Sequence, residues 1–150
     1  MLAFERVIDR LPAGFDNMRA EATAEGYRFV ERLFKDWEAN ATRFDRDGEA
    51  LLAAYVSDVL AAIGGVTFDP VVTSASRMRR FYVRRPFRGT GIGRKLVEAL
   101  LEYPRGVGRI VVVNAARGSS PFWEAVGFVS DMREGHTHIL PTSHSTARPH

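Results

Sequence analysis

Apolar residues recur along the chain with two different periods, and the order of these periods predicts an α/β fold. Residues 4–10 form the first expected strand, which ends at a break that contains Pro12 and Gly14. A helical region is expected from an N-cap at Asp16 onwards, and Gly26 divides it into two helices. In the second helix, apolar residues at steps of three and four indicate one face packed into the core. These residues are Tyr27, Val30, Leu33, Phe34 and Trp37.

Three strands are expected in the middle of the chain. Residues 50–57, 59–68 and 78–83 carry the strand-like pattern, and a tight turn joins the first two. Gly64 and Gly65 lie inside the second strand, where they indicate a bulge or a close approach of another group to the backbone.

A helix is expected to follow the third strand, from about residue 91 to Tyr103, and to end at Pro104 because proline cannot continue a helix. Residues 109–114 contain an uninterrupted β-branched run, which is typical of a central strand buried on both faces. The strand, helix and strand between residues 78 and 113 should therefore form a parallel, right-handed β-α-β unit.

The C-terminal part is predicted to contain a short helix over residues 120–126 and a last hairpin. The strands of this hairpin are residues 128–131 and 136–140. One domain is expected over residues 1–140, with residues 141–150 as a disordered tail.

The composition excludes several classes of protein. The 150 residues contain no cysteine, so disulfides, thiolate metal sites and a cysteine nucleophile are excluded, which agrees with a cytoplasmic location. No run of eighteen apolar residues is present, and no membrane segment is expected. His136 and His138 alternate onto one strand face without a third ligand, so a partly exposed pair is expected and no metal site.

The net charge of +3 is unevenly distributed, with eight basic and no acidic residues between Ser76 and Lys95. Such a field attracts a polyanion: a nucleotide cofactor, a nucleic acid or an acidic substrate. The aromatic residues follow the core periodicity and do not alternate with the arginines as stacking platforms do, which disfavours nucleic acid. The basic residues are Arg77, Arg79, Arg80, Arg84, Arg85, Arg88, Arg94 and Lys95.

A glycine-rich turn between a strand and a helix suits phosphate, because the first free N–H groups of the helix point at the anion. A Walker A loop needs G-x-x-x-x-G-K-[ST], but the fifth residue after Gly89 is Arg94. A dinucleotide fingerprint that starts at Gly89 needs a glycine at the same position 94. Both motifs are therefore excluded.

The remaining pattern is Arg88-x-x-Gly91-x-Gly93, preceded by F-Y-V and followed by an amphipathic helix. It resembles the acyl-CoA-binding motif [QR]-x-x-G-x-[GA] of the GNAT N-acetyltransferase superfamily. The later segment S-S-P-F-W-E-A-V-G-F is similar to a second element of that family, F-Y-E-x-x-G-F. The resemblance covers roughly residues 45–131. It implies a GNAT-like three-layer fold with a mixed, mostly antiparallel sheet around the central parallel β-α-β unit.

The resemblance implies that acetyl-CoA lies between the two parallel strands as the acyl donor. The backbone of Tyr82 and Val83 would pair with the pantetheine amides, and the N–H groups of the glycine turn would bind the pyrophosphate. Asn114 would face the pantetheine, and the segment from Ser119 to Trp123 would border the thiol. The residues implied to bind the cofactor are Tyr82, Val83, Arg88, Gly89, Thr90, Gly91, Ile92, Gly93, Arg94, Lys95, Asn114, Ser119 and Trp123.

The implied reaction is direct attack by a primary amine of a small molecule or peptide on the acetyl thioester. The main-chain N–H of Val83 would polarise the thioester carbonyl. Trp123 stands where relatives often have a tyrosine general acid. An indole N–H donates a hydrogen bond but no proton, so Trp123 would stabilise the thiolate or merely pack, and packing is favoured.

Arg77 stands where many relatives carry an acidic residue that accepts the proton of the amine. Arg77 and Arg79 share a strand face, where they would meet a carboxylate or phosphate of the acceptor or else face solvent. Asp69, Glu49 and His136 remain open as the base.

Two further functions stay open. One is a degenerate GNAT domain that binds acyl-CoA without efficient transfer, and the other, less favoured, is a nucleic-acid-binding module. A homodimer is common among relatives of the family, although no sequence feature specifies an interface.

Overall fold

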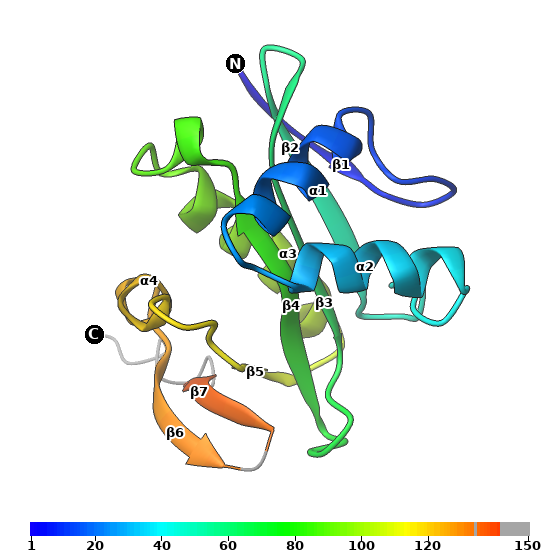
Figure 1. Ribbon diagram of the computed structural model, residues 1–150. Helices are drawn as coiled ribbons and strands as arrows, with labels where there is room; N and C mark the ends of the chain where they lie inside the picture. The colour runs from blue at the N-terminus through cyan, green and yellow to red at the C-terminus, as the bar shows by residue number, and fades with distance from the viewer. Residues whose placement is uncertain (134, 142–150) are drawn as a thin grey trace.

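The computed structural model describes residues 1–133 and 135–141, so the expected tail lies outside the described residues apart from Pro141. One seven-stranded sheet crosses the molecule in the order β1-β2-β3-β4-β5-β7-β6 (Figure 1). The pair β4–β5 is parallel and the other neighbouring pairs are antiparallel. The strands are β1 (Leu2–Arg6), β2 (Ala50–Val56), β3 (Val59–Phe68), β4 (Ala75–Val83), β5 (Ile110–Val113), β6 (Val129–Arg133) and β7 (His136–Leu140).

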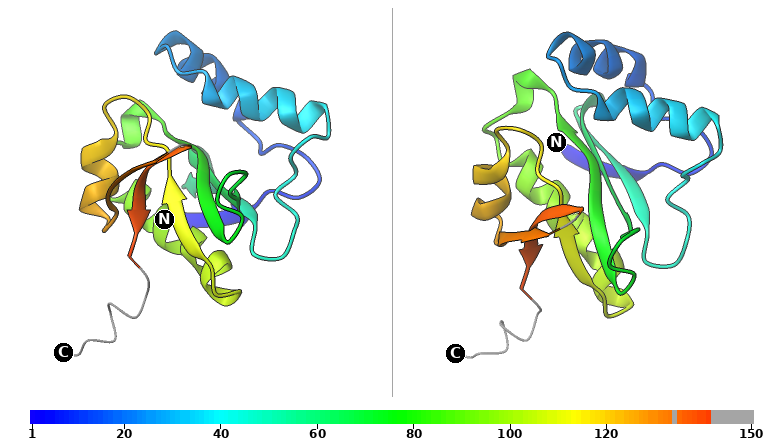
Figure 2. Two further views of the ribbon diagram at one scale, coloured as in Figure 1. Left: turned by 90° about the horizontal axis from the view of Figure 1, so that it is seen from below. Right: turned by 60° about the horizontal axis from the view of Figure 1, so that its bottom comes forward.

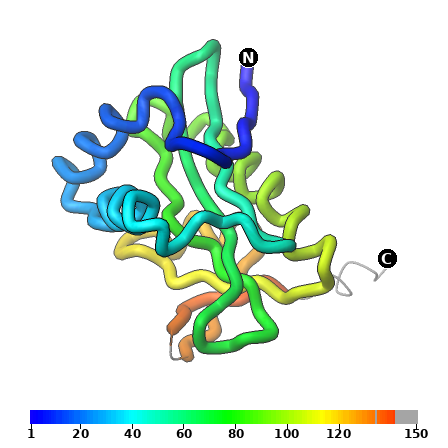
Figure 3. The backbone as a smooth tube through the Cα atoms, turned by 90° about the vertical axis from the view of Figure 1, so that its right-hand side faces the viewer, coloured from blue at the N-terminus to red at the C-terminus, as the bar shows by residue number. Residues whose placement is uncertain are grey.

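Helices cover both faces of the sheet, which gives three layers. The helices α1 (Phe15–Ala24) and α2 (Phe29–Glu38) lie on one face, and α3 (Ile92–Gly106) and α4 (Ser120–Ala125) lie on the other (Figures 2 and 3). A short 3-10 turn, η1 (Arg85–Phe87), connects β4 to α3. The expected α/β fold with a central parallel unit, β4-α3-β5, is confirmed. Within the described residues, no helix is long and apolar enough to cross a membrane.

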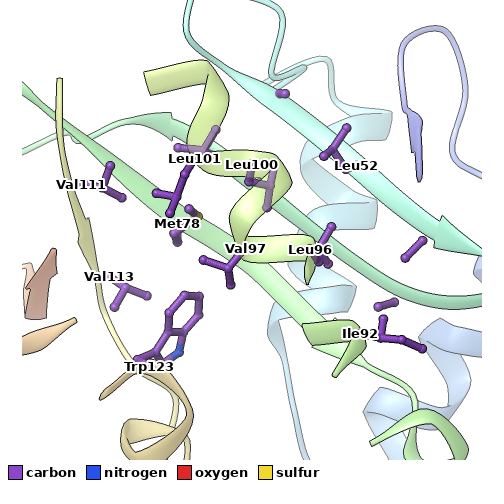
Figure 4. Close-up of a cluster of buried hydrophobic side chains, with 14 of the residues drawn as sticks. Leu52, Met78, Ile92, Leu96, Val97, Leu100, Leu101, Val111, Val113 and Trp123 are labelled. Carbon is purple, nitrogen blue, oxygen red and sulfur yellow. The ribbon is translucent and has the colours of Figure 1, made fainter. Parts of the chain in front are cut away.

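The core on the α3 side is built around the parallel unit. Leu96 and Leu100 of α3 are fully buried in one cluster with Met78 of β4 and with Val111 and Val113 of β5 (Figure 4). Each such leucine contributes roughly 1.5–3 kcal/mol through burial. The side chains of Val111, Val112 and Val113 are each at most 3% exposed, so β5 is buried on both faces as its β-branched run predicts.

The core on the opposite face joins α1 and α2 to β2 and β3. Phe15 and Met18 of α1 are buried together with Leu33 and Trp37 of α2. The predicted apolar stripe is thus largely confirmed. Tyr27 differs, because it precedes α2 and is only half-buried.

Two predicted boundaries near the N-terminus are wrong. The first strand is β1, an edge strand that ends at Arg6. The N-cap of α1 is Gly14, with φ 89°, and Asp16 lies inside the first helical turn. Phe15 must start the helix because its side chain, 3% exposed, is fixed in the core.

Pro104 does not end α3 as predicted, since the helix continues to Gly106. Proline removes only its own N–H, and its carbonyl still accepts hydrogen bonds from the N–H groups of Val107 and Arg109. Burial of Pro104 against the sheet favours this last turn.

A β-bulge in β4 decides which side chains face which core. Gly65 pairs with Arg79 and Ile63 pairs with Tyr82, so β4 has one residue more than β3 in this interval. The extra residue, Arg80, has φ 57° in the left-handed region. As a result, Met78 faces α3 whereas Tyr82 packs with α1 and α2.

The glycine pair of β3 lies directly opposite this bulge. A Cβ atom at Gly64 would lie 2.5 Å from the ring carbon Cδ2 of Phe81, and one at Gly65 would lie 2.5 Å from Cε2 of Phe44. The sequence-based expectation of a bulge or a close approach is therefore confirmed on both counts.

The contact between Gly64 and Phe81 leads to a stability prediction. Gly64→Ala should lower the free energy of unfolding by about 1–3 kcal/mol, because the added methyl group overpacks the Phe81 ring. Urea unfolding followed by circular dichroism measures this change. Gly106→Ala is the matched control, since no atom lies within 4 Å of its added Cβ. Equal stability of Gly64→Ala and wild type would contradict the close packing.

Candidate functional site

A cleft opens where the two parallel strands separate. The last paired residues are Met78 of β4 and Val113 of β5, and the cleft beyond them has a volume of about 470 Å³. The ends of β4 and β5 form its walls. Tyr27 lines it from the α1–α2 connection and Phe29 from the first turn of α2, and Phe122 and Trp123 line it from α4. The cleft therefore borders every layer of the fold.

The backbone of Val83 is directed toward this cleft. Val83 lies opposite Ala62, and the N–H of Arg84 donates to the carbonyl of Ala61 at 2.9 Å. This pattern makes Ala62 and Val83 a non-hydrogen-bonded pair, so the N–H and C=O of Val83 point away from β3. The carbonyl of Val83 accepts a hydrogen bond from Nε of Arg88 at 2.8 Å. Tyr82, which pairs with Ile63, directs its backbone to β3.

The glycine turn forms the start of α3 as the sequence indicates. Gly89 and Gly91 have φ values of 78° and 87°, which favour glycine, and Gly91 is the N-cap. No atom lies within 4 Å of a Cβ built at either position. The first N–H groups of α3 have no acceptor within the helix, so they are available to an anion in this open space. Ile92 is buried, and Thr90 Oγ1 donates to the carbonyl of Phe87.

Gly93 serves helix packing. A Cβ there would lie 2.9 Å from Cε1 of Phe122, so its absence lets α4 approach α3 closely. Arg94 supports the same contact, because Nη2 donates to the carbonyl of Ala125 at 3.1 Å. Lys95 is exposed on the first turns of α3.

Glu25, at the end of α1, holds the cationic loop that precedes α3. Its carboxylate accepts two hydrogen bonds from Arg88, at 2.7 and 3.0 Å, and one from the Tyr82 hydroxyl at 2.5 Å. Arg85 also pairs with it at 2.8 Å. The hydrogen bonds from Arg88 and Tyr82 lower the pKa of Glu25 to about 2. Burial, followed by the bond to Glu25, raises the pKa of Tyr82. The hydroxyl of Tyr82 therefore stays protonated.

Other arginines of the basic segment are also neutralised by α1 and α2. Arg84 makes a bidentate ion pair with Glu21, with N–O distances of 2.7 and 2.9 Å, and Arg80 pairs with Asp36 at 2.9 Å. The basic run is therefore partly balanced by carboxylates distant in sequence. This balance weakens the polyanion field on which a nucleic-acid module depends.

Arg77 and Arg79 line the cleft, and both are half-buried. Neither makes an ion pair with the described residues. Burial, together with the neighbouring guanidinium groups of Arg80 and Arg77, lowers the pKa of Arg79 to about 10. Arg79 therefore remains charged at neutral pH in a place where its charge is unfavourable.

Trp123 is part of an aromatic cluster. Its side chain is 3% exposed, and its ring centre lies 5.0–5.2 Å from those of Phe81, Phe122 and Phe128. These edge-to-face contacts fill the core between α4 and β4. They provide the packing role that the sequence favours for Trp123.

Asn114 and Ser119 border the cleft on the side of β5. Asn114 is exposed directly after the last strand residue. The next N–H, of Ala115, donates to Thr137 Oγ1 at 3.0 Å, and Ser119 Oγ donates to the carbonyl of Ala116 at 2.7 Å. These bonds fix the connection between β5 and α4.

None of the three open candidates for the base lines the cleft. The carboxylate of Glu49 accepts from the N–H of Phe68 at 2.8 Å, and that of Asp69 accepts from the N–H of Val72 at 2.6 Å. His136 contacts Asp131 through Nε2 at 3.0 Å. Of the described residues that line the cleft, none is aspartate, glutamate or histidine.

The histidine pair of β7 is buried, whereas a partly exposed pair was expected. His136 and His138 are 4% and 3% exposed. Each contacts one carboxylate, Asp131 and Glu124 respectively, because β6 and α4 pack over this end of the sheet. Over residues 1–133 and 135–141, no group of three or more metal-binding side chains is found.

Several residues at the site cannot be predicted from the sequence. Glu25 lies 63 positions before Arg88, and only the fold brings them together. Tyr27 has the helical period of a core residue, although it lines the cleft. Arg32 and Arg117 lie outside the basic run, and no local pattern distinguishes them from exposed surface arginines.

A family model described as an acetyltransferase (GNAT) domain matches residues 17–141. The chain belongs to this GNAT acetyltransferase family, as the motifs around Gly91 indicate. Among curated proteins, none matches the sequence.

Solved structures with the same fold include a candidate acetyltransferase from Exiguobacterium sp. 255-15. It is 26% identical, with 99% of each chain covered and a TM-score of 0.87. PaiA N-acetyltransferase from Thermoplasma acidophilum, solved in complex with coenzyme A, is 13% identical, with 93% and 96% covered and a TM-score of 0.65. Glucosamine-6-phosphate N-acetyltransferase from Arabidopsis thaliana is 17% identical, with 89% and 95% covered and a TM-score of 0.58.

The low pKa of Glu25 predicts a pH-dependent contribution to stability. Its folded pKa of about 2 lies below the ordinary 4.5, so this contribution is complete above pH 4.5 and is lost as the pH falls toward 2. Glu25→Gln should therefore lower the free energy of unfolding by about 1–2 kcal/mol at pH 7. The difference from wild type should shrink near pH 3.

Urea unfolding at pH 7, 5 and 3 measures this difference. Glu98→Gln, on the exposed surface of α3, is the matched control and should change little at any pH. A Glu25→Gln deficit that is the same at all three pH values would show that the charge of Glu25 is not involved.

Proposed function

We propose that this protein is an N-acetyltransferase that transfers the acetyl group of acetyl-CoA to a primary amine of a small molecule or peptide by direct attack. The observation that carries the proposal is the cleft between β4 and β5, which opens beside the glycine turn at the start of α3. Membership of the GNAT family and the likeness to a coenzyme A complex support it.

The pyrophosphate of acetyl-CoA would lie at the glycine turn. Gly89 and Gly91 leave room for it, and the N–H groups of the first turn of α3, including those of Ile92, Gly93 and Arg94, would donate to it. Arg88 would position the turn while paired with Glu25, and Lys95 would add charge from the exposed face of α3. Thr90 would hold the turn through Phe87.

The pantetheine would extend from the turn into the cleft. Val83 offers the N–H that points away from β3, and Asn114 offers its side chain from the opposite wall. Tyr82 would contribute its ring, because its backbone is directed to β3 and its hydroxyl donates to Glu25. Ser119 and Trp123 would border the thiol end.

Transfer at this site would proceed without a covalent enzyme intermediate. The neutral amine nitrogen attacks the thioester carbon, and the N–H of Val83 stabilises the oxyanion that forms. As the C–S bond breaks, the attacking nitrogen loses a proton to water and the departing coenzyme A thiolate takes up a proton from water, so that the products are the amide and the free thiol. No carboxylate or imidazole among the described residues lines the cleft to accept the proton of the amine. The amine would therefore react in its neutral form after losing its proton to water.

A second candidate function is binding of acyl-CoA without efficient transfer. The same lack of a proton acceptor among the described cleft residues favours it, as does the tight packing of Trp123. The two candidates differ in one measurable property, which is release of free thiol in the presence of an amine.

Isothermal titration with acetyl-CoA tests the cofactor site. Gly91→Asp should weaken binding at least roughly tenfold, because it places a carboxylate where the anion binds. Gly108→Asp is the matched control, since Gly108 also has positive φ and open space but follows the C-terminal end of α3, away from its first N–H groups. If wild type does not bind acetyl-CoA at high micromolar concentration, the proposed function is wrong.

The pH profile of transfer tests the role of the amine. The value of kcat/KM should rise with pH until it passes the pKa of the acceptor amine itself. Two acceptors that differ in amine pKa should give profiles displaced by the same amount. Thiol release is measured with a chromogenic disulfide. A profile that is identical for both acceptors would require a titrating group of the protein, and absence of thiol release with every amine would favour the binding function.

A further inference from the structure

We propose that the acceptor amine carries an oxyanion, a carboxylate or a phosphate, that binds to the guanidinium groups of Arg77 and Arg79 in the cleft. This inference rests on the proposed function and specifies its substrate class. Arg32 of α2 and Arg117 of the β5–α4 connection would complete the site at its rim.

The charge of the cleft lining is one-sided. Six arginines line it and, among the described residues, no acidic side chain does. Two of the six are neutralised from outside the cleft, Arg80 by Asp36 and Arg88 by Glu25. The other four make no ion pair with the described residues: Arg32, Arg77, Arg79 and Arg117.

Arg79 is the central member of this group. It lies on β4 between Arg77 and Arg80, and the bulge at Arg80 places consecutive arginines on the face that α2 covers. Half-burial without a paired carboxylate is costly for a charged side chain. Burial is also the main cause that lowers the pKa of Arg79, and the charges of Asp36 and Asp69 raise this pKa by less. A bound oxyanion would supply the missing charge.

The position along β4 assigns these arginines to the acceptor rather than to the cofactor. The pyrophosphate would lie at Gly91, beyond the C-terminal end of β4, whereas Arg77 and Arg79 precede the bulge. Arg79 lies opposite Gly65 and Val83 lies opposite Ala62, so the two positions are three β3 residues apart, which corresponds to about 10 Å along the sheet. The thioester would lie near Val83, so an amine that reaches it can place a second group toward Arg79.

The cleft also limits the size of the acceptor. Its volume of about 470 Å³ must hold the end of the pantetheine as well as the acceptor. Half-buried guanidinium groups inside such a cleft are suited to bind a single oxyanion through bidentate hydrogen bonds. The rings of Tyr27 and Phe29, with centres 5.3 Å apart, form an apolar wall beside it. A small amino acid or an amino phosphate fits this description.

Matched pairs of acceptors test the proposal. Each pair differs in one anionic group: an amino acid with its amide, and O-phosphoethanolamine with ethanolamine. The value of kcat/KM should be at least about tenfold higher for the anionic member of one pair. The pair with the larger ratio tells carboxylate from phosphate. Spermidine, which is entirely cationic, should be a poor acceptor.

Arg79→Met removes the charge and keeps an unbranched apolar chain in place of the aliphatic stem of arginine. It should reduce kcat/KM for the anionic acceptor roughly ten- to a hundredfold, mainly through KM, and leave neutral amines within about twofold. Arg79→Lys should have a kcat/KM for the anionic acceptor between those of Arg79→Met and wild type, because lysine keeps the charge but cannot make the bidentate hydrogen bonds. Arg105→Met, on the exposed last turn of α3, is the control for net charge. An equal loss for anionic and neutral acceptors would overturn the proposal.

Binding measurements separate this proposal from the proposed function. The protein is saturated with coenzyme A, which fills the pyrophosphate site, and is titrated with inorganic phosphate and with N-acetylglycine in a calorimeter. Binding by wild type that is lost in Arg79→Met supports the oxyanion site even if no amine reacts. Absence of binding for both anions overturns the oxyanion site, even if acetyl-CoA binds and neutral amines are acetylated.

Discussion

Backbone pairing between the parallel strands β4 and β5 ends at Met78 and Val113, and the cleft depends on this interruption. Backbone groups left unpaired inside a sheet are costly unless other partners satisfy them. The structure provides one such partner on the wall of β4, where Arg88 donates to the carbonyl of Val83. The N–H of Ala115, beyond β5, instead donates to Thr137 of β7 on the other side of β5. The N–H of Val83 is directed into the space that remains, where a ligand can accept from it.

The acidic residues of α1 and α2 sort the arginines of the basic segment into two groups. Arg84, Arg85 and Arg88, which precede the glycine turn, are paired with Glu21 and Glu25, which hold this segment in place. Arg77 and Arg79, which lie earlier on β4, have no such partner among the described residues. In the proposed function, one strand would therefore combine a preorganised cofactor end with an acceptor end where a bound anion supplies the missing charge. Because Glu25 also accepts from the Tyr82 hydroxyl, the end of α1 is connected to β4 as well as to the loop before α3.

Local patterns predict most of the fold because they depend on residues close in sequence. The β-branched run of β5 and the period of α3 each report burial of one segment against a sheet. The boundaries at Asp16 and Pro104 are wrong for a common reason. The local preference of a residue to start or end a helix is worth at most a few kcal/mol. Burial of Phe15 outweighs this preference at the first boundary, and burial of Pro104 itself outweighs it at the second.

The sequence alone determined the glycine turn, the strand before it and the helix after it, because their geometry follows from glycine spacing and local periodicity. It also placed Arg77 and Arg79 on one face of their strand. Only the tertiary structure decided which arginines keep an unpaired charge, since Glu25 and Asp36 reach their partners across tens of residues. The bulge at Arg80 is likewise a property of the sheet, because it exists only in the register between β3 and β4.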